Sequence, residues 1–197
     1  MDRNYEINID AFKRLEENPG EKSVFSRDGF IEWQAGMSSV KFGKVTAAYG
    51  GCGAIATWNI LKAFGFDSDK ALHFKEMEKG AIFGGKLGTG IFFIKKYLEN
   101  KGHQADMYFS FKEFKKAFSR IGIVYYIKDN FKAHFVAFTP AGVNEKGEFI
   151  YRFHNANAGA YWKTFDEVKY IENLPMTMED FLKESNAKVK VFYDVRK

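Results

Sequence analysis

The stretch from Tyr49 to Gly65, YGGCGAIATWNILKAFG, decides how the fold is built. Two glycines break the chain directly before Cys52. The residues that follow are apolar or small on nearly every side of a helix, and a helix of that kind is buried. Gly65 is a natural helix end, because glycine readily adopts the left-handed conformation found there. The stretch therefore predicts a buried helix over residues 52–64, opened by the only cysteine of the chain.

On either side of this stretch, the first half of the chain is mostly helical in pattern and the second half mostly β. Further helices are expected over residues 10–18, 68–79, 89–101, 110–120, and 176–184, with capping boxes at Ser110/Glu113 and Thr164/Glu167. Strands are expected over residues 104–109, 122–128, 133–139, 148–154, and 188–195, with a turn at Asp129-Asn130 and a loop over 140–147. Helices followed by meandering strands predict an α+β fold. We expect a single domain over 1–197, with a helical part to about 120 and a sheet part from about 121.

Composition narrows the possible functions. The 197 residues are 46% hydrophobic and 28% charged, which suits a globular domain and excludes a disordered chain. The net charge of +5 is spread without a basic run, so nucleic-acid binding is not expected, and a basic RNA-binding domain ranks last among the functions considered. One cysteine excludes an internal disulfide. We expect no cofactor and no metal, since His73, Glu76 and Glu78 fit a solvated helix face better than a metal site.

Two further absences concern location. No apolar run is long enough to span a membrane, and the N-terminus MDRNYEINID lacks the basic and apolar regions of a signal peptide. A cytoplasmic protein is therefore expected.

Cys52 stands where a nucleophile is favoured. The first turn of a helix presents unpaired N–H groups and a positive dipole end, which lower the pKa of a thiol and can stabilise an oxyanion. The flanking glycines leave room for a substrate backbone. The alternative is a small buried cysteine that packs as a hydrophobe. The glycines and the helix start favour the nucleophile, with a lowered thiol pKa.

A cysteine nucleophile needs a base and a residue that orients it. His73 and His103 are expected at the surface, whereas His134 begins the apolar strand HFVAF. If that strand pairs with the next one, Asn155 returns beside His134 and can accept the imidazole N–H. Strand alternation favours Asn155 over His154 but leaves Asn157 open. An ordinary strand-end histidine and a polar turn are the plainer alternatives.

Three segments together resemble the papain-like cysteine peptidase fold, in the compact C39-like variant that includes bacteriocin-leader processing domains of bacteria. They are YGGCGAIATWNILKAFG, GTGIFFIKKYLENKGHQADMY and AHFVAF…FIYRFHNANAG, within residues 49–159. The resemblance implies that Cys52 is the nucleophile, His134 the base and Asn155 the orienting residue. It also implies a papain-like fold, in which the buried helix packs on a C-terminal antiparallel sheet.

The sequence departs from this family at two points. The family usually has a glutamine shortly before the cysteine as an oxyanion donor, where this chain has Thr46. Thr46, Tyr49 and Gln34 are the candidates to replace it, and Gly51 is a further candidate for the substrate cleft. The usual Asp-Pro after the second strand is replaced by Asn155-Ala156.

The expected function is therefore a cysteine peptidase or amide-bond hydrolase that acts on a peptide or protein substrate through a thioester. Two alternatives stay open. One is an acyltransferase with the same triad, and the other is a degenerate domain that binds peptides without cleaving them. The glycine-rich loop over residues 84–90 matches no phosphate-binding motif and is expected to flank the substrate cleft.

Overall fold

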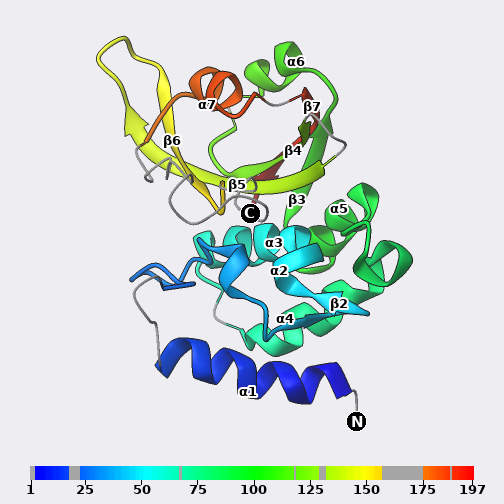
Figure 1. The fold of residues 1–197 in the computed structure, drawn as a ribbon. Coiled ribbons are helices and arrows are strands. Elements are labelled where there is room, and N and C mark those ends of the chain that lie inside the picture. Colours follow the sequence, from blue (N-terminus) through cyan, green and yellow to red (C-terminus); the bar gives the residue numbers. More distant parts are fainter. Residues whose placement is uncertain are drawn as a thin grey trace.

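A five-stranded antiparallel sheet organises the chain (Figure 1). The structure is a computed structural model that describes residues 3–17, 23–66, 68–117, 119–128, 132–156, 175–186 and 188–197. The strands are β3 (Gln104–Tyr108), β4 (Gly122–Lys128), β5 (Lys132–Val143), β6 (Phe149–His154) and β7 (Lys188–Arg196), and their order in space is β3-β7-β4-β5-β6. With the helices packed on it, this sheet confirms the α+β class.

Helices cover both faces of the sheet. They are α1 (Arg3–Glu17), α2 (Ala47–Gly50), α3 (Cys52–Ala63), α4 (Lys70–Met77), α5 (Ile91–Asn100), α6 (Phe111–Lys116) and α7 (Met178–Glu184). Short 3-10 turns lie at η1 (Gln34–Gly36), η2 (Glu78–Gly80) and η3 (Ile82–Gly85), and a small hairpin joins β1 (Lys41–Phe42) to β2 (Val45–Thr46). Figure 1 shows α6 and α7 on one face of the sheet, α3 against the other, and α4 and α1 beyond α3.

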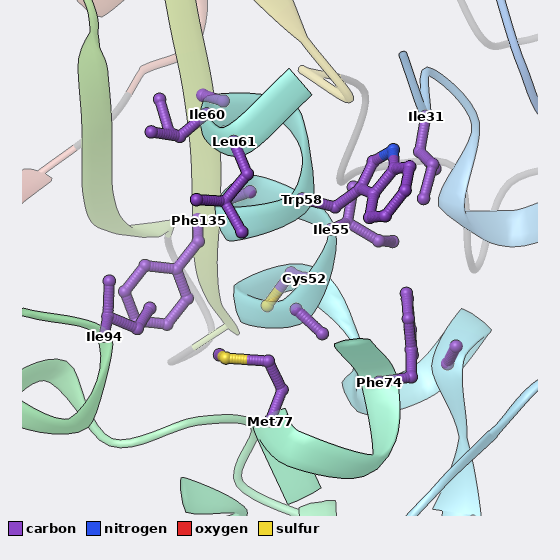
Figure 2. Packing of buried hydrophobic residues seen from close by; sticks show 14 of the residues in the cluster. Ile31, Cys52, Ile55, Trp58, Ile60, Leu61, Phe74, Met77, Ile94 and Phe135 are labelled. Atoms are coloured by element: carbon purple, nitrogen blue, oxygen red, sulfur yellow. The ribbon is translucent and has the colours of Figure 1, made fainter. Parts of the chain in front are cut away.

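The buried residues form two clusters, one on each side of the sheet. The cluster around α3 includes Ile55, Trp58 and Leu61 of the helix with Phe135 of β5, as Figure 2 shows. Every residue of α3 from Cys52 to Leu61 is buried, as expected for a helix that is apolar on nearly all sides. The second cluster lies under α6 and α7 and includes Tyr126, Val136, Phe138, Phe153 and Phe181.

Two elements extend beyond their expected bounds, and each has a physical reason. Helix α1 begins at Arg3 rather than near residue 10. Its buried Asn8 accepts a hydrogen bond from Lys41 N (2.7 Å) and donates one to Lys41 O (3.0 Å). A polar residue therefore stands on the buried face of α1 and interrupts the spacing of apolar residues that predicts a helix. Strand β5 runs through Pro140 to Val143, because the ladder with β6 shifts register between Pro140 and Gly142. Proline is tolerated in a strand at such an irregularity.

Other details of the expected layout also changed. The helix expected over residues 89–101 begins at Ile91, with Gly90 rather than Thr89 as its N-cap residue. The Ser110 cap is confirmed, since its hydroxyl accepts from Glu113 N at 3.2 Å. Strand β3 lies inside the expected helical part but joins the sheet beside β7, so a boundary near residue 120 does not separate helices from strands. The turn at 129–130, the Thr164/Glu167 cap and Asn157 lie outside the described residues.

Candidate active site

Cys52 is the first residue of α3 and lies at the edge of the core. Its side chain is 7% exposed and sits in the α3 cluster, in the neighbourhood that also holds Phe135 (Figure 2). Burial raises the pKa of the Cys52 thiol, and backbone hydrogen bonds from Phe135, Gly53 and Cys52 itself act in the opposite direction. The expectation of a lowered thiol pKa is therefore wrong for this environment, because removal from water outweighs the help of the helix terminus.

His134 lies near the start of β5, directly opposite Tyr126 of β4. It is buried, and its Nε2 atom lies 2.8 Å from the backbone oxygen of Asn155. A carbonyl oxygen can only accept, so Nε2 carries the proton and Nδ1 carries the lone pair of the neutral ring. The backbone of the next residue, Phe135, lies near enough to the Cys52 sulfur to lower the pKa of its thiol. His134 and the residue whose backbone approaches the Cys52 sulfur are therefore neighbours in β5, while the His134 ring lies beside Tyr126, a residue of the second cluster.

Asn155 follows the last residue of β6 and approaches His134 as expected. The β5–β6 hairpin pairs Ala137 with His154, which returns residue 155 toward the start of β5. The contact to the imidazole, however, comes from the backbone carbonyl and not from the side-chain amide. The amide is turned toward Gln34 instead: Asn155 Oδ1 accepts from Gln34 N at 3.0 Å, and Asn155 Nδ2 donates to Gln34 Oε1 at 3.1 Å.

The expected oxyanion candidates lie in different settings. Gln34 does reach back toward the cysteine segment, but its Nε2 donates to the carbonyls of Ala47 and Ala48, each at 3.1 Å. Thr46 is the N-cap residue of α2, and its side chain makes no capping hydrogen bond. Tyr49 is 54% exposed, and the buried Gly51 directly precedes α3. Gln34 is thus bound to backbone carbonyls, so the structure gives it a bridging contact rather than a donor aimed at a substrate.

The glycine-rich loop packs on the segment around Cys52, consistent with its expected position beside the site. A Cβ atom added to Gly50 would lie 2.2 Å from Gly85 O, and one added to Gly53 would lie 2.6 Å from Thr89 Oγ1. Both distances are shorter than van der Waals contact. The glycines at positions 50 and 53 therefore allow two backbone segments to meet at the start of α3.

This contact predicts a stability change for Gly50→Ala. The new methyl group would meet the Gly85 carbonyl, so the backbone must shift, and we expect a loss of about 2 kcal/mol in the free energy of unfolding. Gly90→Ala, in the glycine-rich loop, is the matched control, because its Cβ would find its nearest neighbour at 3.8 Å. Urea denaturation of both variants measures the difference, and equal midpoints would contradict the close approach.

The other histidines differ from their expected surface positions. His73 is 2% exposed, so its assignment to the surface is wrong: its Nε2 lies 2.8 Å from Ala54 O, and its Nδ1 lies 2.9 Å from Tyr97 Oη. His103 is partly buried and stacks on Phe64. The polar partners of His73 belong to α3 and α5, which the pattern of its own helix could not reveal.

Sequence reasoning missed two residues near the site. Tyr126 is fully buried, its ring centroid lies 5.8 Å from that of His134, and within the described parts of the chain its hydroxyl has no hydrogen-bond partner. Glu32 accepts from His154 Nδ1 at 2.8 Å, from Arg152 at 2.7 Å and from Asn155 N at 3.2 Å. Tyr126 lies in an apolar strand pattern that signals only core, and Glu32 lies in an irregular segment without a pattern.

A cavity of about 290 Å³ lies apart from Cys52. It is lined by residues of α6, α7 and the β5–β6 hairpin, including Phe114, Phe149 and Met178. Phe114 and Met178 belong to the buried cluster on the opposite side of the sheet from α3. This cavity therefore lies on the other side of the sheet from Cys52.

Among the residues that the structure describes, no group of three His, Cys, Asp or Glu side chains could hold a metal ion. In the same part of the chain, no helix combines the length and apolar character needed to cross a membrane. Neither a protein-family model nor a curated protein matches this sequence.

Proposed function

We propose that this protein is a papain-like cysteine hydrolase that cleaves amide bonds of peptides. One observation carries the proposal. His134 donates through Nε2 to the Asn155 carbonyl, and the backbone of the adjacent Phe135 lies near enough to the Cys52 sulfur to lower the pKa of its thiol. A thiol at a helix start and a histidine whose tautomer is set by a third group are the groups that nucleophilic catalysis requires.

The chemical steps follow from the tautomer. His134 Nδ1 takes the proton of the Cys52 thiol as the sulfur attacks the acyl carbon of the substrate. The protonated imidazole then gives this proton to the leaving amine, and the acyl group remains on sulfur as a thioester. Water, deprotonated by the same nitrogen, attacks the thioester and releases the acid and the free thiol. The N–H groups at the start of α3 can stabilise the oxyanion formed in each attack.

Burial of Cys52 shapes the first step. Because burial raises the pKa of the thiol, the resting side chain is protonated, and the attack depends on proton removal by the base rather than on a thiolate formed in advance. The same burial supports the alternative of a degenerate domain that binds a peptide without cleaving it. The Gln34 side-chain amide also donates to two backbone carbonyls rather than to a substrate, which supports this alternative too.

p-Nitrophenyl acetate provides a test that does not require the natural substrate. We expect a burst of p-nitrophenolate, a mass increase of one acetyl group on Cys52, and continued turnover as water resolves the thioester. Cys52→Ala should show neither the burst nor the added mass. The reaction is followed by absorbance and by intact-protein and peptide mass spectrometry.

The outcomes separate the candidate functions. Acetylation of Cys52 without turnover would favour the binding domain. Turnover that accelerates with added glycine amide, and that yields acetylated glycine amide, would favour the acyltransferase. No acetylation of Cys52, or equal acetylation in denatured and folded protein, would contradict the proposed nucleophile.

A further inference from the structure

We propose that Gln34 is a positioning residue that holds the Asn155 carbonyl on His134 and ties it to the segment leading into Cys52. The expected effect of Gln34 on the reaction rate rests on the proposed function. Its expected effect on the His134 tautomer does not, because the tautomer can be measured in the absence of any substrate. Gln34 and Asn155 are 121 residues apart in sequence, so their contact joins distant parts of the chain.

Two hydrogen bonds join Gln34 to the Asn155 side chain, one from the Gln34 backbone and one to the Gln34 side chain. Gln34 N donates to Asn155 Oδ1, and Asn155 Nδ2 donates to Gln34 Oε1, so the Asn155 amide is held at both of its polar atoms. Asn155 is 3% exposed, and a buried polar group that loses its partner is costly. The pair therefore fixes the Asn155 side chain in one orientation.

The backbone of Asn155 explains why this residue needs to be held. Its φ is 59°, in the left-handed region that is uncommon for residues other than glycine and that asparagine tolerates better than most. This conformation turns the Asn155 carbonyl toward His134 Nε2. The neighbouring segment adds a second attachment, since Glu32 accepts from Asn155 N. The side chain of Asn155 thus acts on the imidazole through its own backbone.

Gln34 also connects Asn155 to the segment that leads into Cys52. Its Nε2 donates to Ala47 O and Ala48 O in α2, and the Ala47 carbonyl also accepts from Gly51 N, directly before Cys52. One amide side chain therefore contacts the partner of the base at one end and the helical turn before the nucleophile at the other. We infer that Gln34 sets the orientation of the base relative to the nucleophile.

A double-mutant cycle with Gln34→Ala and Asn155→Gly tests this role. Glycine at 155 keeps the carbonyl and tolerates the positive φ but removes the amide. Each single variant is expected to lower the deacetylation rate of Cys52 about tenfold, the effect of one ordinary hydrogen bond. The double variant is expected to lose about tenfold as well, and not a hundredfold, because both changes remove the hydrogen bond from Asn155 Nδ2 to Gln34 Oε1.

The His134 tautomer, measured by NMR without any substrate, tests the positioning role of Gln34 independently of the reaction rate. In ¹⁵N-labelled protein at about pH 8, where an ordinary imidazole is neutral, the wild type should show His134 as the Nε2–H tautomer, assigned by its loss in His134→Ala. Gln34→Ala and Asn155→Gly should each increase the share of the Nδ1–H tautomer. Gln104→Ala, an exposed glutamine on β3 that bonds Asp106, is the control and should change neither rate nor tautomer.

The outcomes distinguish the two proposals. If the wild type does not acetylate or turn over, the proposed function fails while the tautomer measurement still decides the role of Gln34. If Gln34→Ala leaves the His134 resonances unchanged, or the double variant loses the product of the two single effects, the positioning role is overturned. Circular dichroism and thermal melts of all variants exclude unfolding as the cause of a loss.

Discussion

Replacing His134 with alanine is expected to lower the turnover of p-nitrophenyl acetate by about 10³-fold, the usual contribution of a positioned base. The reason is the protonated state of Cys52. Burial raises the pKa of this thiol, so without the imidazole no group next to the sulfur accepts its proton in the proposed mechanism. Steady-state absorbance measurements and the rate of Cys52 acetylation give the effect.

The control for this variant is His103→Ala rather than His73→Ala. His103 stacks on Phe64 at a partly exposed position, and its Nδ1 has no hydrogen-bond partner among the described residues, so its loss should leave turnover near that of the wild type. His73 is bonded within the core, and its replacement would disturb the first turns of α3. Turnover of His134→Ala at the wild-type rate, in protein with an unchanged melting temperature, would refute His134 as the base.

Local patterns were sufficient for most of the fold. The run GIVYYIK, rich in β-branched and aromatic residues, predicted β4 with its exact bounds, and the apolar run after Cys52 predicted α3 to within one residue. Sheet order could not be predicted in this way. Strand β7 at the end of the chain lies between β3 and β4, and such distant pairing leaves no signal in either strand alone.

The candidate site shows the same division between local and distant information. Glycines before Cys52 indicated a helix start with close backbone contact, and the hairpin of two adjacent strands indicated that residue 155 returns to His134. The atom that makes this contact depended on the left-handed φ of Asn155 and on its pairing with Gln34. The raised thiol pKa depended on burial by residues from several elements, which the helix position alone does not reveal.

The second large effect is a loss of stability at acid pH, and we expect His73 to cause it. Burial lowers the pKa of His73 from 6.5 to about 4, and the nearby charge of Lys101 acts in the same direction, while Ala54 O and the charge of Glu76 oppose it. The neutral ring is therefore the form that fits the core beside Tyr97 and Thr57. Protonation at moderately acid pH would place a charge in this buried position.

The sign of the pH dependence follows from the lowered pKa. Between about 4 and 6.5 the unfolded chain binds a proton at His73 that the folded protein does not, so the free energy of unfolding rises with pH in this window. The contribution of His73 is fully present above about 6.5 and is lost as the pH falls to about 4. For this shift the loss amounts to about 3 kcal/mol.

Urea denaturation of the wild type and of His73→Gln across this pH range measures the His73 contribution. Glutamine can still donate to Ala54 O but does not titrate, so the variant should lose about 3 kcal/mol less than the wild type between the two ends of the window. Burial also lowers the pKa of His103, and a His103→Ala series subtracts its smaller effect of the same sign. If the glutamine variant does not fold, NMR titration of the wild type decides the question, because His73 should stay neutral until the pH approaches 4. A His73 resonance that titrates near 6.5 in the folded protein would show that water reaches the ring and that it does not limit stability in acid.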